Sequence, residues 1–324
     1  MTMRPYHTGV INEFDSLDEL RAFDPHFLEN VDSEIFDNIT EILGCTKAEI
    51  HDVYPLKQGL TNLSCHFATN DGEYVYRHPG VGTELLVNRR SEYTALKKAK
   101  ELGLDDTFIH EDPERGWKIS KFVSNAKQPD PHNAIQMAQM MKICRALHES
   151  GAQVETEFDF YKEAKRYESL LLEKGPIDIP GYWEMAAEVD RLEEYVRADK
   201  APKCLCHNDF FYLNFLIDEA NKYYLIDWEY AGMSDYANDF GTCCVCCELN
   251  ANEIDAALDE YFGRTATQAE RAHNYAHIAL AGWCWYLWAL LKEAEGDFVG
   301  EWLYIYYNYG REYLTKALAL YEEA

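Results

Sequence analysis

The chain has 324 residues, of which 47% are hydrophobic and 14% aromatic, a composition that can bury a substantial core and excludes disorder as the default state. Its 57 acidic and 30 basic residues give a formal net charge of −27, which opposes nonspecific binding to nucleic acid or to an anionic membrane and suits a cationic small-molecule substrate. An anionic ligand would have to be met by local positive charge or by metal ions.

The sequence predicts a cytoplasmic protein without membrane insertion. It opens as MTMRPYHTGV, which lacks the apolar stretch of a secretory signal, so we expect its ten cysteines to be thiols in a reducing compartment. The cysteine cluster between residues 243 and 247 is predicted to pack in a helix core, because no second Cys or His pair follows at zinc-finger spacing. The longest apolar stretch, residues 277–291, is shorter than the ~20 residues of a bilayer span and predicts a buried helix.

Residues 1–50 predict an N-terminal helical extension with two short helices, each beginning at a capping Asp and the second ending at Gly44. Residues 51–123 predict a small lobe. In it, β-forming stretches flank the turn at residues 70–72 and predict a hairpin. Helical spacing in residues 84–103 then predicts one main helix, and a last strand-like stretch ends the lobe.

Residues 124–132 contain two prolines and predict a connector between lobes. The larger lobe, residues 124–324, is helical by pattern except in residues 203–227, where β-formers alternate around a turn at residues 218–221. The predicted fold class is therefore α+β and bilobal. It combines a small N-terminal lobe, with an antiparallel sheet and one main helix, and a larger, mostly helical C-terminal lobe.

Polar side chains at fixed intervals give residues 207–227 a specific chemistry. Asp209 follows His207-Asn208, Asn214 lies five residues later, and Asp227 ends an apolar strand 13 residues after Asn214. Phosphoryl transfer needs one carboxylate to accept the proton of the attacking hydroxyl, and an Asn and a second Asp to hold the magnesium ions. The spacing assigns these roles in that order, since a loop that is merely solvated would not need all three.

The smaller lobe supplies candidate groups for the phosphates of ATP. A short loop before the first hairpin strand can bring backbone N–H groups close to them, although a plain turn is the alternative: Gly59, Leu60, Thr61 and Asn62. Arg77 ends the next strand and Glu92 lies one helix further on. As an ion pair they would aim the guanidinium at the α- and β-phosphates, the alternative being a surface salt bridge.

The order of these motifs resembles the choline/ethanolamine kinase family, within the fold of protein kinases and aminoglycoside phosphotransferases, and resembles its bacterial choline kinases most. The resemblance covers roughly residues 54–310. It rests on GLTN (59–62), YVYRHPG (74–80), NRRSE (88–92), KFV (121–123), HNDFFYLN (207–214), IDWEYAGMSD (226–235) and NDFG (238–241).

This resemblance implies an ATP- and Mg²⁺-dependent kinase in which Asp209 is the base and Asn214 and Asp227 are the metal ligands. Arg77 stands where protein kinases place a lysine, and choline kinases similarly use arginine there.

Two further assignments are implied by the resemblance. The backbone of one segment is expected to form the hinge that binds adenine: Lys121, Phe122 and Val123. The string IDWEYAG separates this family from aminoglycoside kinases, so Glu229 within it is expected to lie near magnesium or substrate; pairing with a nearby basic residue is the alternative.

The expected substrate is choline, which would be converted to phosphocholine. A quaternary ammonium is recognised by aromatic faces and negative charge. Trp285 and Trp288 lie three residues apart on the predicted helix and so share a face, whereas Trp283 falls elsewhere. The resemblance matches this pair to the aromatic wall of the choline pocket, with ordinary core packing as the alternative.

Tyr307 is the expected additional wall, with Tyr304 or Tyr306 as alternatives, and Glu248 is a candidate anion for the ammonium. Ethanolamine, an amino sugar or aminoglycoside, and thiamine are the alternative acceptors. A catalytically silent ATP-binding scaffold is the alternative from another class, and the complete catalytic motif argues against it.

Overall fold

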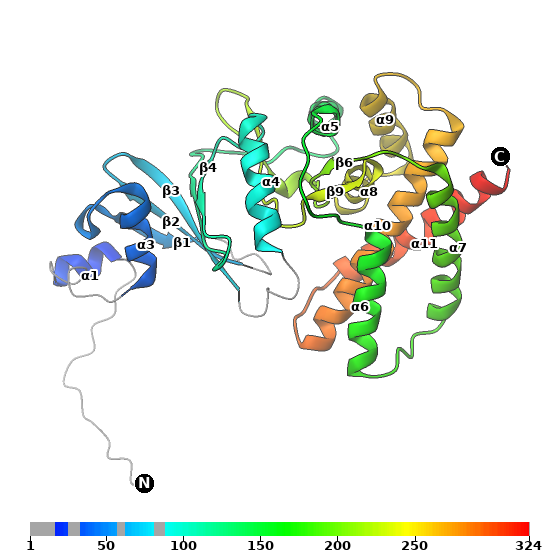
Figure 1. Cartoon of the computed structure of the whole chain (residues 1–324), viewed down its shortest axis with the longest axis horizontal. Coiled ribbons are helices and arrows are strands. Elements are labelled where there is room, and N and C mark those ends of the chain that lie inside the picture. Colours follow the sequence, from blue (N-terminus) through cyan, green and yellow to red (C-terminus); the bar gives the residue numbers. More distant parts are fainter. Residues whose placement is uncertain (1–16, 25–32, 57–61, 81–87, 324) are drawn as a thin grey trace, which may run out of the picture. The chain divides into compact units, whose positions relative to one another are not determined.

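The computed structural model describes four stretches of the chain, residues 17–24, 33–56, 62–80 and 88–323 (Figure 1). Within these stretches, no helix is both long enough and apolar enough to cross a membrane. All ten cysteines lie in them and are free thiols, as predicted.

Contacts divide the chain into two compact units. The first comprises Met1–Leu86 with Thr107–Val123, and the second comprises Val87–Asp106 with Ser124–Ala324. The helix after the hairpin therefore groups with the second unit. The division predicted from sequence, with boundaries after residues 50 and 123, stays a prediction.

The first unit is built on a five-stranded antiparallel sheet of order β1-β2-β3-β5-β4. Its strands are β1 (His51–Pro55), β2 (Asn62–Thr69), β3 (Gly72–Pro79), β4 (Phe108–Glu111) and β5 (Lys118–Lys121). Thr69 pairs with Gly72, so Asn70 and Asp71 form the turn of the predicted hairpin. Four-residue β4 was not predicted, because so short a strand shows little alternation.

Helix α3 (Glu34–Leu43) belongs to the same unit, as do α1 (Leu17–Phe23) and the short η1 (Lys47–Glu49). Ile39 of α3 lies in one buried cluster with side chains from β2, β3 and β5 and from the residues just before β1 and β5: Ile50, Phe67, Tyr76, Trp117 and Ile119. Burying side chains of this size stabilises a fold by about 1.5–3 kcal/mol each. The helix ends at Gly44 (φ 70°), as predicted, but its N-cap is Ser33, not the predicted Asp.

The second unit is mostly helical. Its helices are α4 (Arg89–Glu101), α5 (Ala134–Glu149), α6 (Phe160–Lys174), α7 (Tyr182–Asp199), α8 (Ala237–Cys246), α9 (Ala251–Phe262), α10 (Gln268–Glu295) and α11 (Trp302–Glu322). Two small antiparallel sheets interrupt them, β6 (Lys203–Cys206) with β9 (Gly232–Asp235) and β7 (Phe215–Ile217) with β8 (Tyr223–Leu225). The strand β9 was not predicted, because the strand signal read from sequence ended at residue 227.

Helix α10 forms the centre of this unit and packs against α11, α8 and α6 (Figure 1). Two glycines allow backbones to touch there. A Cβ atom on Gly282 of α10 would lie 2.5 Å from the backbone nitrogen of Gly310 in α11, and one on Gly241 of α8 would meet the backbone of His277 in α10. Only glycine permits such close approach, so α8 is fixed against α10.

The predicted fold class is confirmed, since an antiparallel sheet occupies the N-terminal part of the chain and helices dominate the rest. The cysteines at 243–247 are buried in and just after α8, as predicted. They belong to none of the metal-capable clusters found among the described residues.

Candidate active site

The segment between β6 and β7 brings two of the predicted catalytic groups together. Asn214 closes the short helix η3 (Tyr212–Asn214), and its side-chain Nδ2 donates to Asp209 Oδ2 at 2.7 Å and to the Asp209 backbone oxygen at 2.8 Å. The amide thereby holds the Asp209 carboxylate in one orientation. The side-chain oxygen of Asn214, Oδ1, is the atom that could coordinate a metal ion.

Asp227 is tied to the same segment through its neighbour, because the Ile226 N–H donates to the Asn214 backbone oxygen at 2.9 Å. Asp227 itself has φ 64°, a left-handed conformation that is uncommon for a residue other than glycine. Such conformations persist where the surrounding structure imposes them, often at functional sites. Asn214 and Asp227 are therefore fixed relative to each other by backbone pairing.

Asp239, in the first turn of α8, anchors the start of the catalytic segment. Its fully buried carboxylate accepts the backbone N–H of His207 at 2.9 Å and of Asn208 at 2.6 Å, and it lies 3.0 Å from His148 Nε2. Thr242 Oγ1 donates to the Asn208 backbone oxygen at 3.0 Å. Asn208 is held with φ 63° by these contacts, so the residue before Asp209 is immobilised from three sides.

His207 is a structural member of the motif. Its ring is buried, its Nε2–H donates to the Ile226 backbone oxygen at 2.9 Å, and Trp228 packs against it with ring centroids 4.8 Å apart. Burial lowers the pKa of His207, which keeps the ring neutral at physiological pH. The histidine thus joins the catalytic segment to the strand end that carries Asp227.

Asp209 lies in an unusually negative environment. Burial and the charge of Asp227, with a further contribution from Glu229, raise the pKa of Asp209 to about 8. A carboxylate in this state is stabilised by a nearby cation. Asp209, Asn214 and Asp227 can each offer a side-chain oxygen to a metal ion. Mg²⁺ prefers oxygen ligands, so the residues present fit a magnesium site.

Glu229 is buried and lies 3.8 Å from Arg89 Nη1, which also contacts Glu92 Oε2 at 2.9 Å. The side chain of Ser91 adds a hydrogen bond to the Ala231 backbone oxygen at 3.0 Å. The start of α4 is thereby attached to the segment that follows Asp227. Arg89 was missed by the sequence reasoning, although the quoted string NRRSE contained it.

The predicted nucleotide residues of the first unit are only partly described. Arg77 is buried in β3, with Nη2 3.7 Å from Glu111 Oε1 of β4. Because Glu92 belongs to the other unit, its pairing with Arg77 stays a prediction. Gly59, Leu60 and Thr61 lie outside the described residues, and only the backbone of Asn62 is described.

The predicted hinge segment ends β5. The Lys121 N–H donates to the Thr107 oxygen at 2.8 Å and the Phe122 N–H donates to the Glu73 oxygen at 2.9 Å. Since the sheet uses these two donors, adenine would have to bind other backbone groups of residues 121–123.

Trp285 and Trp288 lie together on α10, with ring centroids 6.2 Å apart and planes at 89°. Tyr230, which follows Glu229, meets the ring of Trp285 at 5.5 Å. Burial and the charges of Glu229, Asp209 and Asp227 raise the pKa of Tyr230 well above its usual value. An aromatic group therefore lies within electrostatic reach of the acidic site. Trp283 packs instead on Tyr182, with centroids 5.2 Å apart.

Of the three candidate tyrosines on α11, Tyr306 lies within electrostatic reach of Asp209, whose charge contributes to raising its pKa. Tyr307 is half-buried against Tyr286, with centroids 5.3 Å apart, and Tyr304 is 68% exposed. Glu248 is exposed directly after α8 with φ 52°. Tyr306, one of the two alternatives named from sequence, is thus buried and senses the charge of Asp209, while a role for Tyr307 stays a prediction.

The chain is similar to known proteins in sequence and in structure. The model of the phosphotransferase enzyme family matches residues 52–273. Protein LicA of Haemophilus influenzae is 24% identical over 279 residues, which cover 82% of this chain and 78% of that protein.

Two solved structures are similar along nearly the whole chain. The choline kinase LicA from Streptococcus pneumoniae has a TM-score of 0.71 and 26% identity, covering 90% of this chain and 98% of that one. A choline/ethanolamine kinase family protein from Mesorhizobium loti has a TM-score of 0.67 and 27% identity, covering 94% of each chain. The family match spans more than half of the chain, and the protein therefore belongs to the phosphotransferase enzyme family and transfers a phosphoryl group to an alcohol.

Proposed function

We propose that the protein is a choline kinase, which transfers the γ-phosphoryl group of ATP to the hydroxyl of choline and releases phosphocholine and ADP. The observation that carries the proposal is the catalytic segment, in which Asn214 orients Asp209 and is paired through the backbone to the neighbour of Asp227. Similarity to a choline kinase over 90% of the chain supports choline as the acceptor.

Asp209 is assigned as the base. Its carboxylate orients the choline hydroxyl and accepts its proton while the hydroxyl oxygen bonds to the γ-phosphorus. The bond from that phosphorus to the bridging oxygen breaks, and ADP leaves. Asn214 and Asp227 would hold Mg²⁺, which supplies positive charge to neutralise the phosphates. Burial and the Asp227 charge raise the pKa of Asp209 to about 8 without metal. Positive charge bound at Asp227 would lower this pKa, so the Asp209 carboxylate would be ionised and able to accept the proton.

We assign the first unit and the start of α4 to ATP. The assignment covers the loop residues Gly59, Leu60, Thr61 and Asn62, the pair of Arg77 and Glu92, and the backbone of Lys121, Phe122 and Val123. Ten free thiols support a reducing, cytoplasmic setting.

The acceptor's ammonium group is assigned to the aromatic residues beside the acidic site. Trp285 and Tyr230 meet edge to face, and Trp288 meets Trp285 in the same way. Cation–π contacts contribute about 0.5–2 kcal/mol, which corresponds to a preference of about 2-fold to 30-fold for a quaternary ammonium. Glu229 supplies negative charge, and Tyr306 replaces Tyr307 as the favoured tyrosine of α11; a role for Glu248 stays a prediction.

A coupled ADP-release assay with Mg-ATP tests the proposal across choline, ethanolamine, thiamine and amino sugars. We expect the highest kcat/KM with choline, and we expect Asp209→Ala to abolish turnover while nucleotide binding is retained. A higher kcat/KM with ethanolamine would move the assignment to that acceptor and leave the kinase activity in place. No ADP release with any acceptor, with nucleotide still bound, would favour a scaffold.

A further inference from the structure

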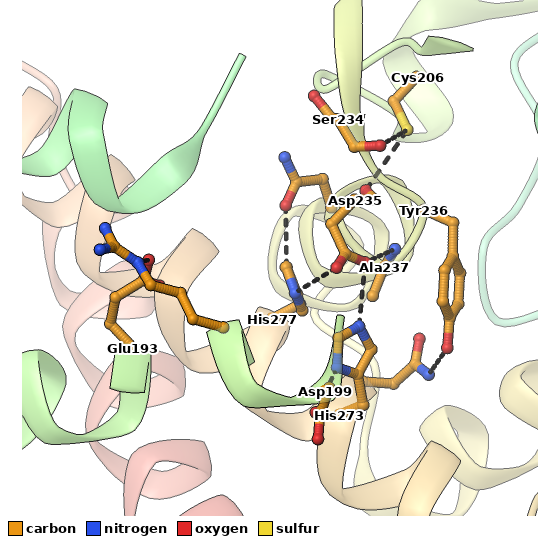
Figure 2. A network of polar contacts seen from close by, with 12 residues as sticks. Glu193, Asp199, Cys206, Ser234, Asp235, Tyr236, Ala237, His273 and His277 are labelled. Carbon is orange, nitrogen blue, oxygen red and sulfur yellow. Dashed lines mark hydrogen bonds and ion pairs between the residues drawn. The ribbon is translucent and has the colours of Figure 1, made fainter. Parts of the chain in front are cut away.

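Away from the proposed phosphoryl-transfer site, three metal-binding side chains of the second unit meet at the end of β9. His273 and His277 lie one turn apart on α10, and both rings point toward Asp235, the last residue of β9 (Figure 2). His273 Nε2 is 3.0 Å from Asp235 Oδ1, and His277 Nε2 is 3.6 Å from Asp235 Oδ2. The three residues thus present two nitrogens and a carboxylate to one point.

The other nitrogen of each ring is held by an oxygen. His277 Nδ1 lies 2.8 Å from Asn238 Oδ1, and His273 Nδ1 lies 2.8 Å from Asp199 Oδ2. Each Nδ1 therefore carries a proton and donates it. Metal-binding histidines almost always donate their second N–H to a carboxylate or carbonyl in this way, which fixes the ring and makes the metal-binding nitrogen more basic.

His277 has one ring nitrogen that no hydrogen bond within the described part of the chain satisfies. Its side chain is 4% exposed, and its Nε2 has no hydrogen-bond partner among the described residues. The His277 and His273 rings lie side by side, with centroids 4.8 Å apart. Against the effect of burial, the Asp199 and Asp235 carboxylates raise the pKa of His273 to about 9, so a metal ion at its Nε2 would displace a proton. One divalent cation would satisfy both Nε2 atoms and the carboxylate together.

One ligand atom from each of Asp235, His273 and His277 lies within 4.8 Å of the other two. Around zinc, with bonds of about 2.0–2.1 Å, neighbouring ligand atoms are about 3.3 Å apart. The two histidines face different oxygens of Asp235, at 3.0 and 3.6 Å, so small side-chain movements would bring all three onto one ion. A cavity of about 350 Å³ is lined by Asp235 and His277, and also by charged residues of both signs: Asp159, Lys162, Glu193, Arg197, Lys200 and Lys203. It offers room for a water molecule as the fourth ligand.

Other metal-capable clusters among the described residues are less suitable. Two of them share His148, with cysteines of α5 or β6. Both nitrogens of His148 already have partners, the Tyr261 hydroxyl at 2.8 Å and Asp239 at 3.0 Å. Its ring would have to give up a bond to the residue that anchors the catalytic segment.

We propose that Asp235, His273 and His277 form a binding site for a zinc-class divalent cation, separate from the oxygen-only magnesium site of phosphoryl transfer. Imidazole nitrogens select zinc-like ions over magnesium, so the two sites discriminate by ligand chemistry. Asn238 connects them, because its Oδ1 accepts from His277 and its Nδ2 donates to Asn208 Oδ1 at 3.1 Å.

Metal analysis of the full-length protein tests this site. Chelator-treated protein is titrated with Zn²⁺ in excess Mg²⁺, and the bound zinc is measured after dialysis together with the melting temperature. We expect one zinc ion per chain and a higher melting temperature in the native protein and in His132→Ala, an exposed-histidine control. We expect loss of both effects in Asp235→Asn and His277→Ala.

Two further measurements locate the ion. Asp199→Ala should weaken zinc binding by about 10-fold to 100-fold, because it removes the acceptor of the His273 Nδ1–H. Co²⁺ should give a visible spectrum without the near-ultraviolet band that thiolate ligands produce. Absence of zinc from the native protein, or zinc that persists in a folded Asp235→Asn variant, would overturn the proposal, as would a thiolate band. Persistence in that variant would assign the ion to the cysteines or to the catalytic carboxylates.

Discussion

Replacing Asp209 with asparagine should make the metal-free protein more stable at pH 8 while it removes activity. The pKa of Asp209 is raised from 3.8 to about 8 by burial and by the charge of Asp227. Between these values the unfolded chain releases the proton and the folded protein retains it. The native protein therefore loses stability as the pH rises from about 4 to 8, because its folded state binds more protons than its unfolded state.

The full pKa difference corresponds to at most about 6 kcal/mol at 1.36 kcal/mol per pH unit. Solvent access and relaxation around Asp209 reduce this, so we expect Asp209→Asn to gain about 1–3 kcal/mol over the native protein at pH 8. The gain should vanish near pH 4, where both side chains are neutral. The asparagine oxygen can still accept the hydrogen bond that Asn214 Nδ2 gives to Oδ2 at 2.7 Å.

Urea unfolding at pH 4, 6 and 8 in chelator-containing buffer measures the difference. Asp218→Asn is the matched control of opposite sign, because backbone donation from Lys222 lowers the pKa of Asp218. That variant should be less stable than the native protein by the same amount at pH 6 and pH 8, and the deficit should shrink as the pH falls below about 4. If Asp209→Asn is no more stable than the native protein at pH 8, the account of the acidic site is wrong. Its kcat should fall by about 10²-fold to 10⁴-fold, the usual contribution of a general base.

Three further substitutions probe the acceptor pocket, the anchor and the helix packing. Trp285→Ala should raise the KM for choline by about 2-fold to 30-fold and leave the KM for ATP unchanged in steady-state kinetics. Asp239→Asn should cost about 1.5–3 kcal/mol in urea unfolding and lower kcat more than it changes either KM, because the catalytic segment loses its charged acceptor. Gly282→Ala should cost about 1–3 kcal/mol in the same assay, because its Cβ would lie 2.5 Å from the Gly310 nitrogen.

A specific result would contradict each of these three predictions. Trp183 is 51% exposed, so Trp183→Ala should leave both KM values unchanged. If Trp285→Ala and Trp183→Ala change the KM for choline equally, Trp285 contributes only to core packing. Normal kcat in Asp239→Asn would show that the catalytic segment holds its shape without the anchor. A fully stable Gly282→Ala protein would mean that α10 and α11 can separate without cost.

The catalytic segment was predictable because its chemistry is local in sequence. Asp209, Asn214 and Asp227 lie within 19 residues of one another, and a turn between two short strands is enough to bring them together. The hairpin and Gly44 were predictable for the same reason, since turn and cap residues act on their immediate neighbours.

The residues that hold the site were not predictable, because their roles depend on contacts across the fold. Asp239 lies 32 residues from His207, whose N–H it accepts, and Arg89 is 140 residues from Glu229. The strings NDFG and NRRSE marked these positions, but spacing along the chain does not say which backbone groups a carboxylate will meet. The choice of Tyr306 over Tyr307 depends on which side of α11 is buried. A run of closely spaced tyrosines does not show this in the sequence.

Asn238 and Asp239 place two kinds of constraint at one turn of α8. Asp239 fixes the backbone of the catalytic segment, and Asn238 joins the side chain of Asn208 to His277. The Asn238 amide can satisfy both partners in only one orientation, because its oxygen must face the His277 Nδ1–H while its NH₂ group faces Asn208 Oδ1. An aspartate at position 238 would lack the donor, and a leucine would lack both groups. Any change that rotates His277, including an ion at its Nε2, therefore acts on the residue that precedes Asp209.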